Sequence, residues 1–136
     1  MAEQRQAVAR PLSPHLQIYR FTITMAMSII HRITGAGLYA GSALVAWWLI
    51  ALATGPEAYA AFQAVAGSWI GQLVLIGYTW ALLHHLVGGI RHFIWDTGHG
   101  YDLATVDLLS WGTLAVSATL TLLIWGYILV SSGGAP

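Results

Sequence analysis

The segment that decides the fold is His84-His85-Leu-Val-Gly-Gly-Ile-Arg-His-Phe-Ile-Trp-Asp96, which closes an apolar stretch beginning near Trp69. The whole stretch is long enough to cross a membrane as a helix, because a spanning helix needs roughly 20 predominantly apolar residues. Ionisable side chains are costly at membrane depth, so each one in this helix needs a partner or a function. The two adjacent imidazoles therefore predict a site inside a transmembrane helix.

The composition of the chain is that of a membrane protein. Of its 136 residues, 57% are hydrophobic and only 7% are charged, whereas soluble domains carry about 25% charged residues. Basic and acidic residues are equal in number, so no excess of positive charge points to nucleic acid. The chain has no cysteine, which excludes disulfides and iron–sulfur ligation by its own residues.

Three long apolar stretches predict an all-α membrane protein with a single membrane-anchor domain over residues 1–136. We expect transmembrane helices at about 22–53, 69–96 and 108–130, and a short interfacial helix at 59–66. Among the apolar residues of the third stretch, small Ser, Thr and Gly residues suit close helix packing in lipid. The tail from Ser131 is expected to be disordered.

The arginines predict the orientation in the membrane. Four of the five precede or open the first helix and the fifth lies near the end of the second (Arg5, Arg10, Arg20 and Arg32, then Arg91). Because positive charge is retained on the cytoplasmic side, residues 1–21 and the second loop are predicted to be cytoplasmic. The polar residues 1–10 do not resemble a signal or transit peptide, which favours a bacterial inner membrane, with a processed mitochondrial chain as the alternative.

Helical geometry divides the histidines of the second helix. Positions i, i+4, i+7 and i+11 share a face, so Gly89, His92 and Asp96 follow His85 on one side. His85 lies about 16 Å along the axis from Asp96, which places it near mid-membrane. A haem iron bound by His85 would have its carboxylate tails near His92, and the glycines beside it would let a flat macrocycle or another helix approach. His84 points about 100° away and cannot share that iron.

Each of these residues also has an ordinary structural interpretation. His85 taken alone is about as often a helix–helix hydrogen-bonding residue, and packing is the favoured role for His84. His92 and Arg91 could extend to the membrane surface. Asp96 could be a solvated helix end, but for it we expect an ion pair with His92 or Arg91.

The first helix carries a second group of polar residues at the spacing i, i+3, i+4 and i+7, namely Ser28, His31, Arg32 and Gly35. An arginine can hold a carboxylate such as a haem propionate with two hydrogen bonds. Ser28 and Arg32 can also donate hydrogen bonds to a carbonyl oxygen of a quinone. The alternative is that Arg32 only fixes the topology and Ser28 only packs.

Two segments of the chain resemble signatures of a known family. Arg10-Pro11-Leu12 with Leu16, followed by Ser28-Ile-Ile-His-Arg-Ile-Thr34, resembles the first signature of the cytochrome b membrane-anchor subunit of succinate dehydrogenase, respiratory complex II. The segment from His85 to Gly98 resembles the second signature. Both match without a gap, whereas the third helix is matched only by its length.

The resemblance implies a three-helix anchor that pairs with a second membrane-anchor subunit and docks an iron–sulfur subunit and a flavoprotein subunit. Electrons from succinate would pass through FAD and iron–sulfur clusters, both in those partners, to ubiquinone. The family's axial haem ligand falls on His85, its quinone-binding residues on Ser28 and Arg32, and its haem-propionate contacts on His31 and Arg32, with His92 on the same side. The resemblance implies that the second axial ligand of this haem b comes from the partner anchor, and that succinate is not oxidised in this chain.

Two other kinds of protein compete with this interpretation. A haem b electron carrier of another quinone-linked complex, such as fumarate reductase, a hydrogenase or a formate dehydrogenase, is the closer alternative. The hydrogenase and formate dehydrogenase carriers place paired histidines on several helices of one chain, whereas only His84 and His85 lie deep here. A structural or transport bundle without a cofactor would leave the face of His85, His92 and Asp96 unexplained.

Overall fold

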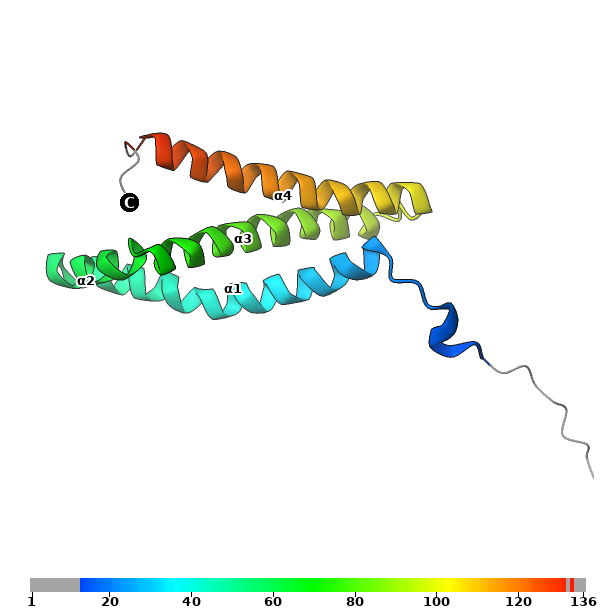
Figure 1. Cartoon of the computed structure of the whole chain (residues 1–136), viewed down its shortest axis with the longest axis horizontal. Coiled ribbons are helices and arrows are strands. Elements are labelled where there is room, and N and C mark those ends of the chain that lie inside the picture. The colour runs from blue at the N-terminus through cyan, green and yellow to red at the C-terminus, as the bar shows by residue number, and fades with distance from the viewer. Residues whose placement is uncertain (1–12, 132, 134–136) are drawn as a thin grey trace, which may run out of the picture.

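The computed structural model describes residues 13–131 and 133, which form a short 3-10 turn and four α-helices (Figure 1). The turn η1 (His15–Ile18) is followed by α1 (Ile23–Thr54), α2 (Pro56–Ala66), α3 (Trp69–Asp96) and α4 (Leu103–Ser131). The described residues contain no strand, so the all-α prediction is confirmed. The predictions for residues 1–12, including Arg5 and the Arg10-Pro11-Leu12 signature, and for tail residues 132 and 134–136 lie outside the described part.

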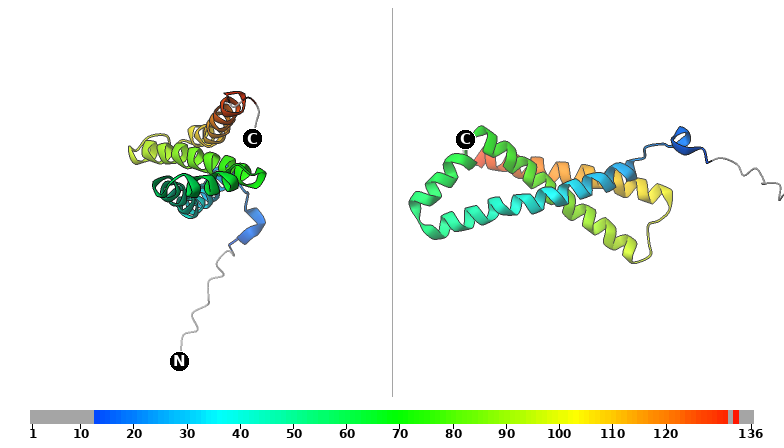
Figure 2. Two further views of the ribbon diagram at one scale, coloured as in Figure 1. Left: turned by 90° about the vertical axis from the view of Figure 1, so that its left-hand side faces the viewer. Right: turned by 90° about the horizontal axis from the view of Figure 1, so that it is seen from below.

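Three of these helices are long and apolar enough to cross a membrane, as the sequence predicted. Their most apolar windows have mean hydropathies of 1.7 in α1, 1.5 in α3 and 1.9 in α4. With 32 residues, α1 is about 48 Å long, which exceeds a hydrocarbon core of about 30 Å. Figure 2 shows α1 lying obliquely across α3, an arrangement that fits a long helix into a thinner membrane.

The ends of two helices differ from the prediction. The first loop helix begins at Pro56, three residues earlier than expected, because proline suits the first helical position. Gly55, with φ of 133°, separates it from α1 and allows a backbone conformation that other residues rarely adopt. The last helix begins at Leu103 and includes the exposed Asp107, since a carboxylate near a helix N-terminus is favourable.

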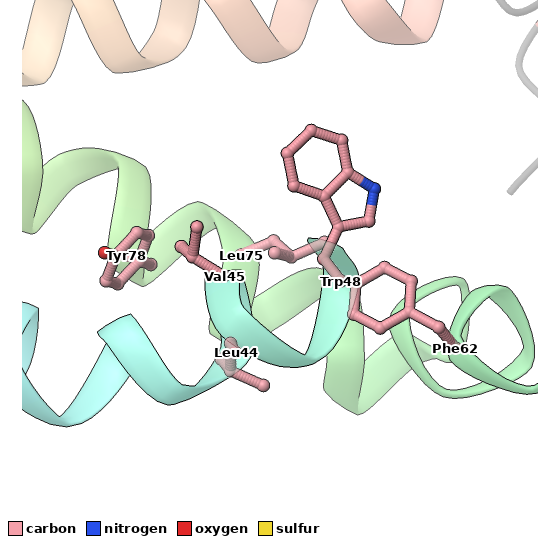
Figure 3. A pocket seen from close by; sticks show the side chains of 6 residues that line it. All are labelled: Leu44, Val45, Trp48, Phe62, Leu75 and Tyr78. Atoms are coloured by element: carbon pink, nitrogen blue, oxygen red, sulfur yellow. The ribbon is translucent and has the colours of Figure 1, made fainter. Parts of the chain in front are cut away.

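The end of the molecule that carries α2 holds an apolar pocket of about 280 Å³ (Figure 3). Leu44, Val45 and Trp48 of α1, Phe62 of α2, and Leu75 and Tyr78 of α3 line it. The edge-on contact of Trp47 with Phe62, whose ring centroids are 5.0 Å apart, ties α2 to α1 nearby. The pocket has no charged lining residue, so it is an apolar packing region between the helices.

Small hydroxyl residues of α4 pack against α3, as the small polar residues of the third stretch predicted. Four of them are buried on one face of α4 (Ser110, Thr113, Ser117 and Thr121). Each donates a hydrogen bond to a carbonyl one turn earlier in its own helix. Ser110 and Ser117 also meet Arg91 and His84 of α3 at 3.3 and 3.2 Å. Because the hydroxyls of Ser110 and Ser117 already donate within α4, they can accept hydrogen bonds from α3 while their own protons stay paired.

The first turn of α4 is held by a carboxylate, which leads to a prediction outside the membrane. Asp102 Oδ1 accepts a hydrogen bond from the backbone N–H of Thr105 at 2.9 Å. Hydrogen bonds from the Thr105 side chain and backbone hold the pKa of Asp102 below its ordinary value of 3.8. The ionised Asp102 therefore stabilises the start of α4 at pH values above 3.8. This contribution is lost as the pH falls through the lowered pKa of Asp102.

We expect Asp102→Ala to raise amide hydrogen exchange in the first turn of α4 near neutral pH, because the Thr105 amide loses its acceptor. The difference from the wild type should disappear at a pH low enough to protonate Asp102. Asp107→Ala is the matched control, since Asp107 is exposed on the same helix and has no capping bond. Equal effects of the two substitutions would contradict the capping role.

Candidate functional site at the crossing of α1 and α3

Two imidazoles from different helices stack where α1 crosses α3. The rings of His31 and His85 are 3.9 Å apart between centroids and within 5° of parallel. Each ring lies against a glycine of the opposite helix. A Cβ added to Gly88 would come within 2.6 Å of His31 Nδ1, and one added to Gly35 within 3.0 Å of His85 Cε1. The sequence predicted that a flat macrocycle or another helix could approach the glycine pair, and at Gly88 the side chain of His31 lies there.

The hydrogen bonds of His85 identify its protonated nitrogen. Its Nδ1 lies 3.1 Å from the carbonyl oxygen of His31 and 3.3 Å from Oγ1 of Thr34. A carbonyl can only accept, and the Thr34 hydroxyl already donates to the same carbonyl at 3.0 Å. The proton of a neutral His85 is therefore assigned to Nδ1, which leaves the lone pair on Nε2.

The Nε2 atom of His85 remains available to a group outside this chain. Among the described residues, the only buried side-chain nitrogens or oxygens without a partner are His31 Nδ1 and Arg91 Nε. His85 Nε2 has no hydrogen-bond partner among those residues either, so it is not fully enclosed. An imidazole whose Nδ1–H is held by a carbonyl and whose Nε2 is free has the arrangement that metal-binding histidines adopt.

His84 faces the opposite way and is buried against α4. It is 1% exposed, its Nδ1 lies 3.2 Å from Ser117 Oγ, and its ring stacks on Trp80 at 5.0 Å. The hydroxyl of Ser117 donates to the carbonyl of Leu114, so it accepts from His84. The adjacent histidines thus lie on different interfaces, His84 against α4 and His85 against α1.

Toward the N-terminal end of α1, the remaining predicted residues form an exposed region. Ser28, Arg32 and His92 are all exposed, and the His92 ring is 5.2 Å from that of His31. Of the four residues predicted to share a face of α1, His31 and Gly35 therefore pack against α3, while Ser28 and Arg32 stay open. The space beside Gly89 is also open, since a Cβ there would meet nothing within 4 Å.

The predicted ion pair of Asp96 is wrong. Asp96 is exposed, and within residues 13–131 and 133 it pairs with neither His92 nor Arg91. Arg91 does not extend to the surface either: it is 4% exposed, and its Nη1 donates to Ser110 Oγ at 3.3 Å. The reason is helical geometry, because Arg91 lies seven residues after His84 and shares the face that packs on α4.

Thr34 is a residue of the candidate site that sequence reasoning missed. It was part of the first signature, but no role was assigned to it. It is 3% exposed and touches the Nδ1 of His85. The available signal was its position three residues after His31, which places both on the same side of the helix.

The fold and this site define a class: membrane proteins whose apolar helices carry imidazoles and a guanidinium at their interfaces. The family described as succinate dehydrogenase/fumarate reductase transmembrane subunit matches residues 6–124, and the chain belongs to this family.

Curated relatives agree with the family assignment. The succinate dehydrogenase cytochrome b556 subunit of Paracoccus denitrificans is 44% identical over 111 residues, which are 82% of this chain and 85% of the relative. The subunit of the same name from Rickettsia felis is 39% identical over 112 residues, covering 82% and 87%. The mitochondrial cytochrome b560 subunit of Sus scrofa is 40% identical over 98 residues, covering 69% and 57%.

Proposed function

We propose that the chain is a membrane-anchor subunit of a succinate:quinone oxidoreductase that provides one axial ligand to a b-type haem and part of a quinone-reducing site. The family match and the cytochrome b names of the relatives support this role. The observation that carries it is the arrangement of His85, with Nδ1 bonded to the His31 carbonyl and Nε2 free.

The residues at the crossing fit a haem. His85 offers an unprotonated nitrogen, and the open space at Gly89 leaves room beside it. Arg32 and His92 are exposed beside the crossing, and with His31, which lies next to His85 and His92, they would hold the propionates. A bound haem supplies reversible one-electron transfer. The hydrogen bonds from Nδ1 to the His31 carbonyl and to Thr34 keep the imidazole oriented and raise the basicity of Nε2.

Ser28 and Arg32 would bind the quinone. They lie one turn apart on α1, and both are exposed, so the hydroxyl and the guanidinium can donate hydrogen bonds to one carbonyl oxygen. The positive charge of Arg32 would stabilise the negative charge that develops on that oxygen as the quinone is reduced. Protons for the reduction would enter from the cytoplasmic side, where the positive-inside rule puts this end of α1.

The rest of the reaction belongs to partner subunits. A second membrane anchor would provide the other axial ligand, an iron–sulfur subunit would deliver electrons, and a flavoprotein with FAD would oxidise succinate. This chain has no cysteine to hold a cluster. The complex would lie in a bacterial inner membrane with the N-terminus of this chain in the cytoplasm, or in a mitochondrial inner membrane. The family also includes fumarate reductase by its description, so the same subunit in a fumarate-reducing complex is the second candidate.

The quinone role predicts separate effects on two activities of the assembled complex. Ser28→Ala and Arg32→Ala should lower ubiquinone reduction, and Arg32→Ala should do so by about tenfold or more, because a hydrogen bond to a charged group contributes about 1.5–3 kcal/mol. Reduction of a soluble dye by succinate should be unchanged, since the dye accepts electrons without the membrane site. Arg20→Ala is the matched control, an exposed arginine just before α1. Equal loss of both activities in the Arg32 variant would show assembly damage and contradict the assignment.

A further inference from the structure

A second polar site lies on the other side of α3, between α3 and α4. A pocket of about 280 Å³ opens there near the loop that joins the two helices. Arg91 and Thr113 are the polar side chains of its lining, and the remaining wall is apolar, including Val87, Gly112 and Val116. The pocket therefore combines one cationic group with a long apolar surface.

Arg91 has unused hydrogen-bonding capacity in this pocket. The side chain is 4% exposed; Nη1 donates to Ser110, and the guanidinium carbon lies 5.1 Å from the centre of the Trp95 ring. Its Nε is buried without a partner, and no carboxylate among the described residues pairs with it. A buried cation with an unpaired donor is costly, so an anion from outside the chain would stabilise it.

The depth of Arg91 matches that of a lipid headgroup. It lies five residues, or about 7.5 Å, before the end of α3, and Ser110 lies about 10 Å after the start of α4. Both are close to the edge of the hydrocarbon core, and from there the apolar wall continues toward Val87 and Val116. Basic pockets between transmembrane helices on the cytoplasmic side are suited to anionic lipid headgroups.

We propose that this pocket binds an anionic phospholipid, with its phosphate against the Nε and Nη2 edge of Arg91 and an acyl chain along the apolar wall. The Nε–H and the adjacent Nη2–H point to the same side of the guanidinium, which is the geometry for two parallel hydrogen bonds to a phosphate. A free anion or a carboxylate of a partner subunit would satisfy Arg91 but leave the apolar wall unused. The proposal does not rest on the haem or quinone roles, since Arg91 faces α4 and the other site faces α1.

The first experiment measures the phospholipids that remain bound to the complex purified in mild detergent, by native mass spectrometry and lipid extraction. Arg91→Gln removes the charge. Gly112→Leu fills the pocket and keeps the arginine, and a Cβ at Gly112 meets nothing within 4 Å, so the backbone tolerates it. Both variants should lose one bound phosphatidylglycerol per chain. Gly126→Leu is the matched control, because it lies on the same helix with equally open space and away from the pocket, and it should retain the lipid.

The second experiment adds back defined anions to the delipidated complex and follows its thermal unfolding midpoint. Phosphatidylglycerol should raise the midpoint of the wild type more than phosphatidylcholine does, and the difference should vanish in Arg91→Gln. Equal protection by inorganic phosphate would overturn the lipid proposal in favour of a simple anion site. Unchanged phosphatidylglycerol content in both variants would also overturn it, and detachment of a partner subunit with unchanged lipid would point to a partner carboxylate. If Arg91→Gln does not assemble, the comparison of Gly112→Leu with Gly126→Leu decides the question.

Discussion

His85→Ala is expected to remove nearly all b-type haem from the assembled complex, whereas His84→Ala is expected to leave the haem in place. Of the two adjacent histidines, only His85 lies at the α1–α3 crossing, and its Nε2 is free while its Nδ1–H is held by the His31 carbonyl. The Nδ1 of His84 is engaged by Ser117 in a buried interface. The measurement is the reduced-minus-oxidised absorbance of the purified complex, divided by its flavin content.

The control for this prediction is the neighbouring histidine itself. His84→Ala loses one intramembrane hydrogen bond, worth about 0.6 kcal/mol on average, so it should lower thermal stability slightly and keep the spectrum. Succinate-dependent dye reduction should survive in both variants, because the flavin and the clusters are in partner subunits. Loss of haem from His84→Ala with retention in His85→Ala would reverse the assignment. A wild-type complex without a b-type spectrum would contradict the haem role of this chain altogether.

Gly88→Ala is expected to have the other large effect, on stability and haem content together. The added methyl group would lie 2.6 Å from His31 Nδ1, and the His31 ring cannot simply rotate away because it is stacked on His85. Relieving the clash requires moving the ring or separating α1 from α3. Overpacking of this kind costs about 1–3 kcal/mol, and it should lower the thermal midpoint of the complex and displace the imidazole that would bind iron.

Gly77→Ala is the matched control for Gly88→Ala. It is on the same helix, and a Cβ there would meet nothing within 4 Å, so the substitution should change neither midpoint nor haem content. If the two alanine variants behave alike, the close packing of His31 against Gly88 is not important for the assembled protein. If Gly88→Ala lowers the midpoint but keeps the full haem spectrum, the His31–His85 stack does not position the axial ligand.

Much of the architecture was predictable because lipid imposes strong rules on sequence. The hydrophobic stretches predicted α1 and α3 to within one residue, since a spanning helix must be apolar along its length. The start of α4 was placed five residues late because Asp107 was counted as the end of the apolar stretch. A negative charge in the first turns of a helix is favourable, and α4 starts directly after its cap, Asp102.

The candidate site was predictable in its residues but not in its contacts. Helical periodicity placed His84 and His85 on different faces and marked the glycines after His85 as a place of close approach. It did not predict the stacking of His31 on His85, the role of Thr34, or the burial of Arg91. These features are contacts between helices. They join residues far apart in the sequence, such as His85 and the His31 carbonyl, which are 54 positions apart.

The sequence by itself determined that this protein has three membrane-spanning helices and that His84 and His85 lie on different faces of one of them, because composition and the helical repeat are local properties. Only the tertiary structure decided which helix each side chain meets. Lipid is as apolar as the helix surfaces, so helix partners are chosen by close packing and a few hydrogen bonds, and these exist only once the helices are together. The same packing that leaves His85 Nε2 open to a ligand buries Arg91 against α4.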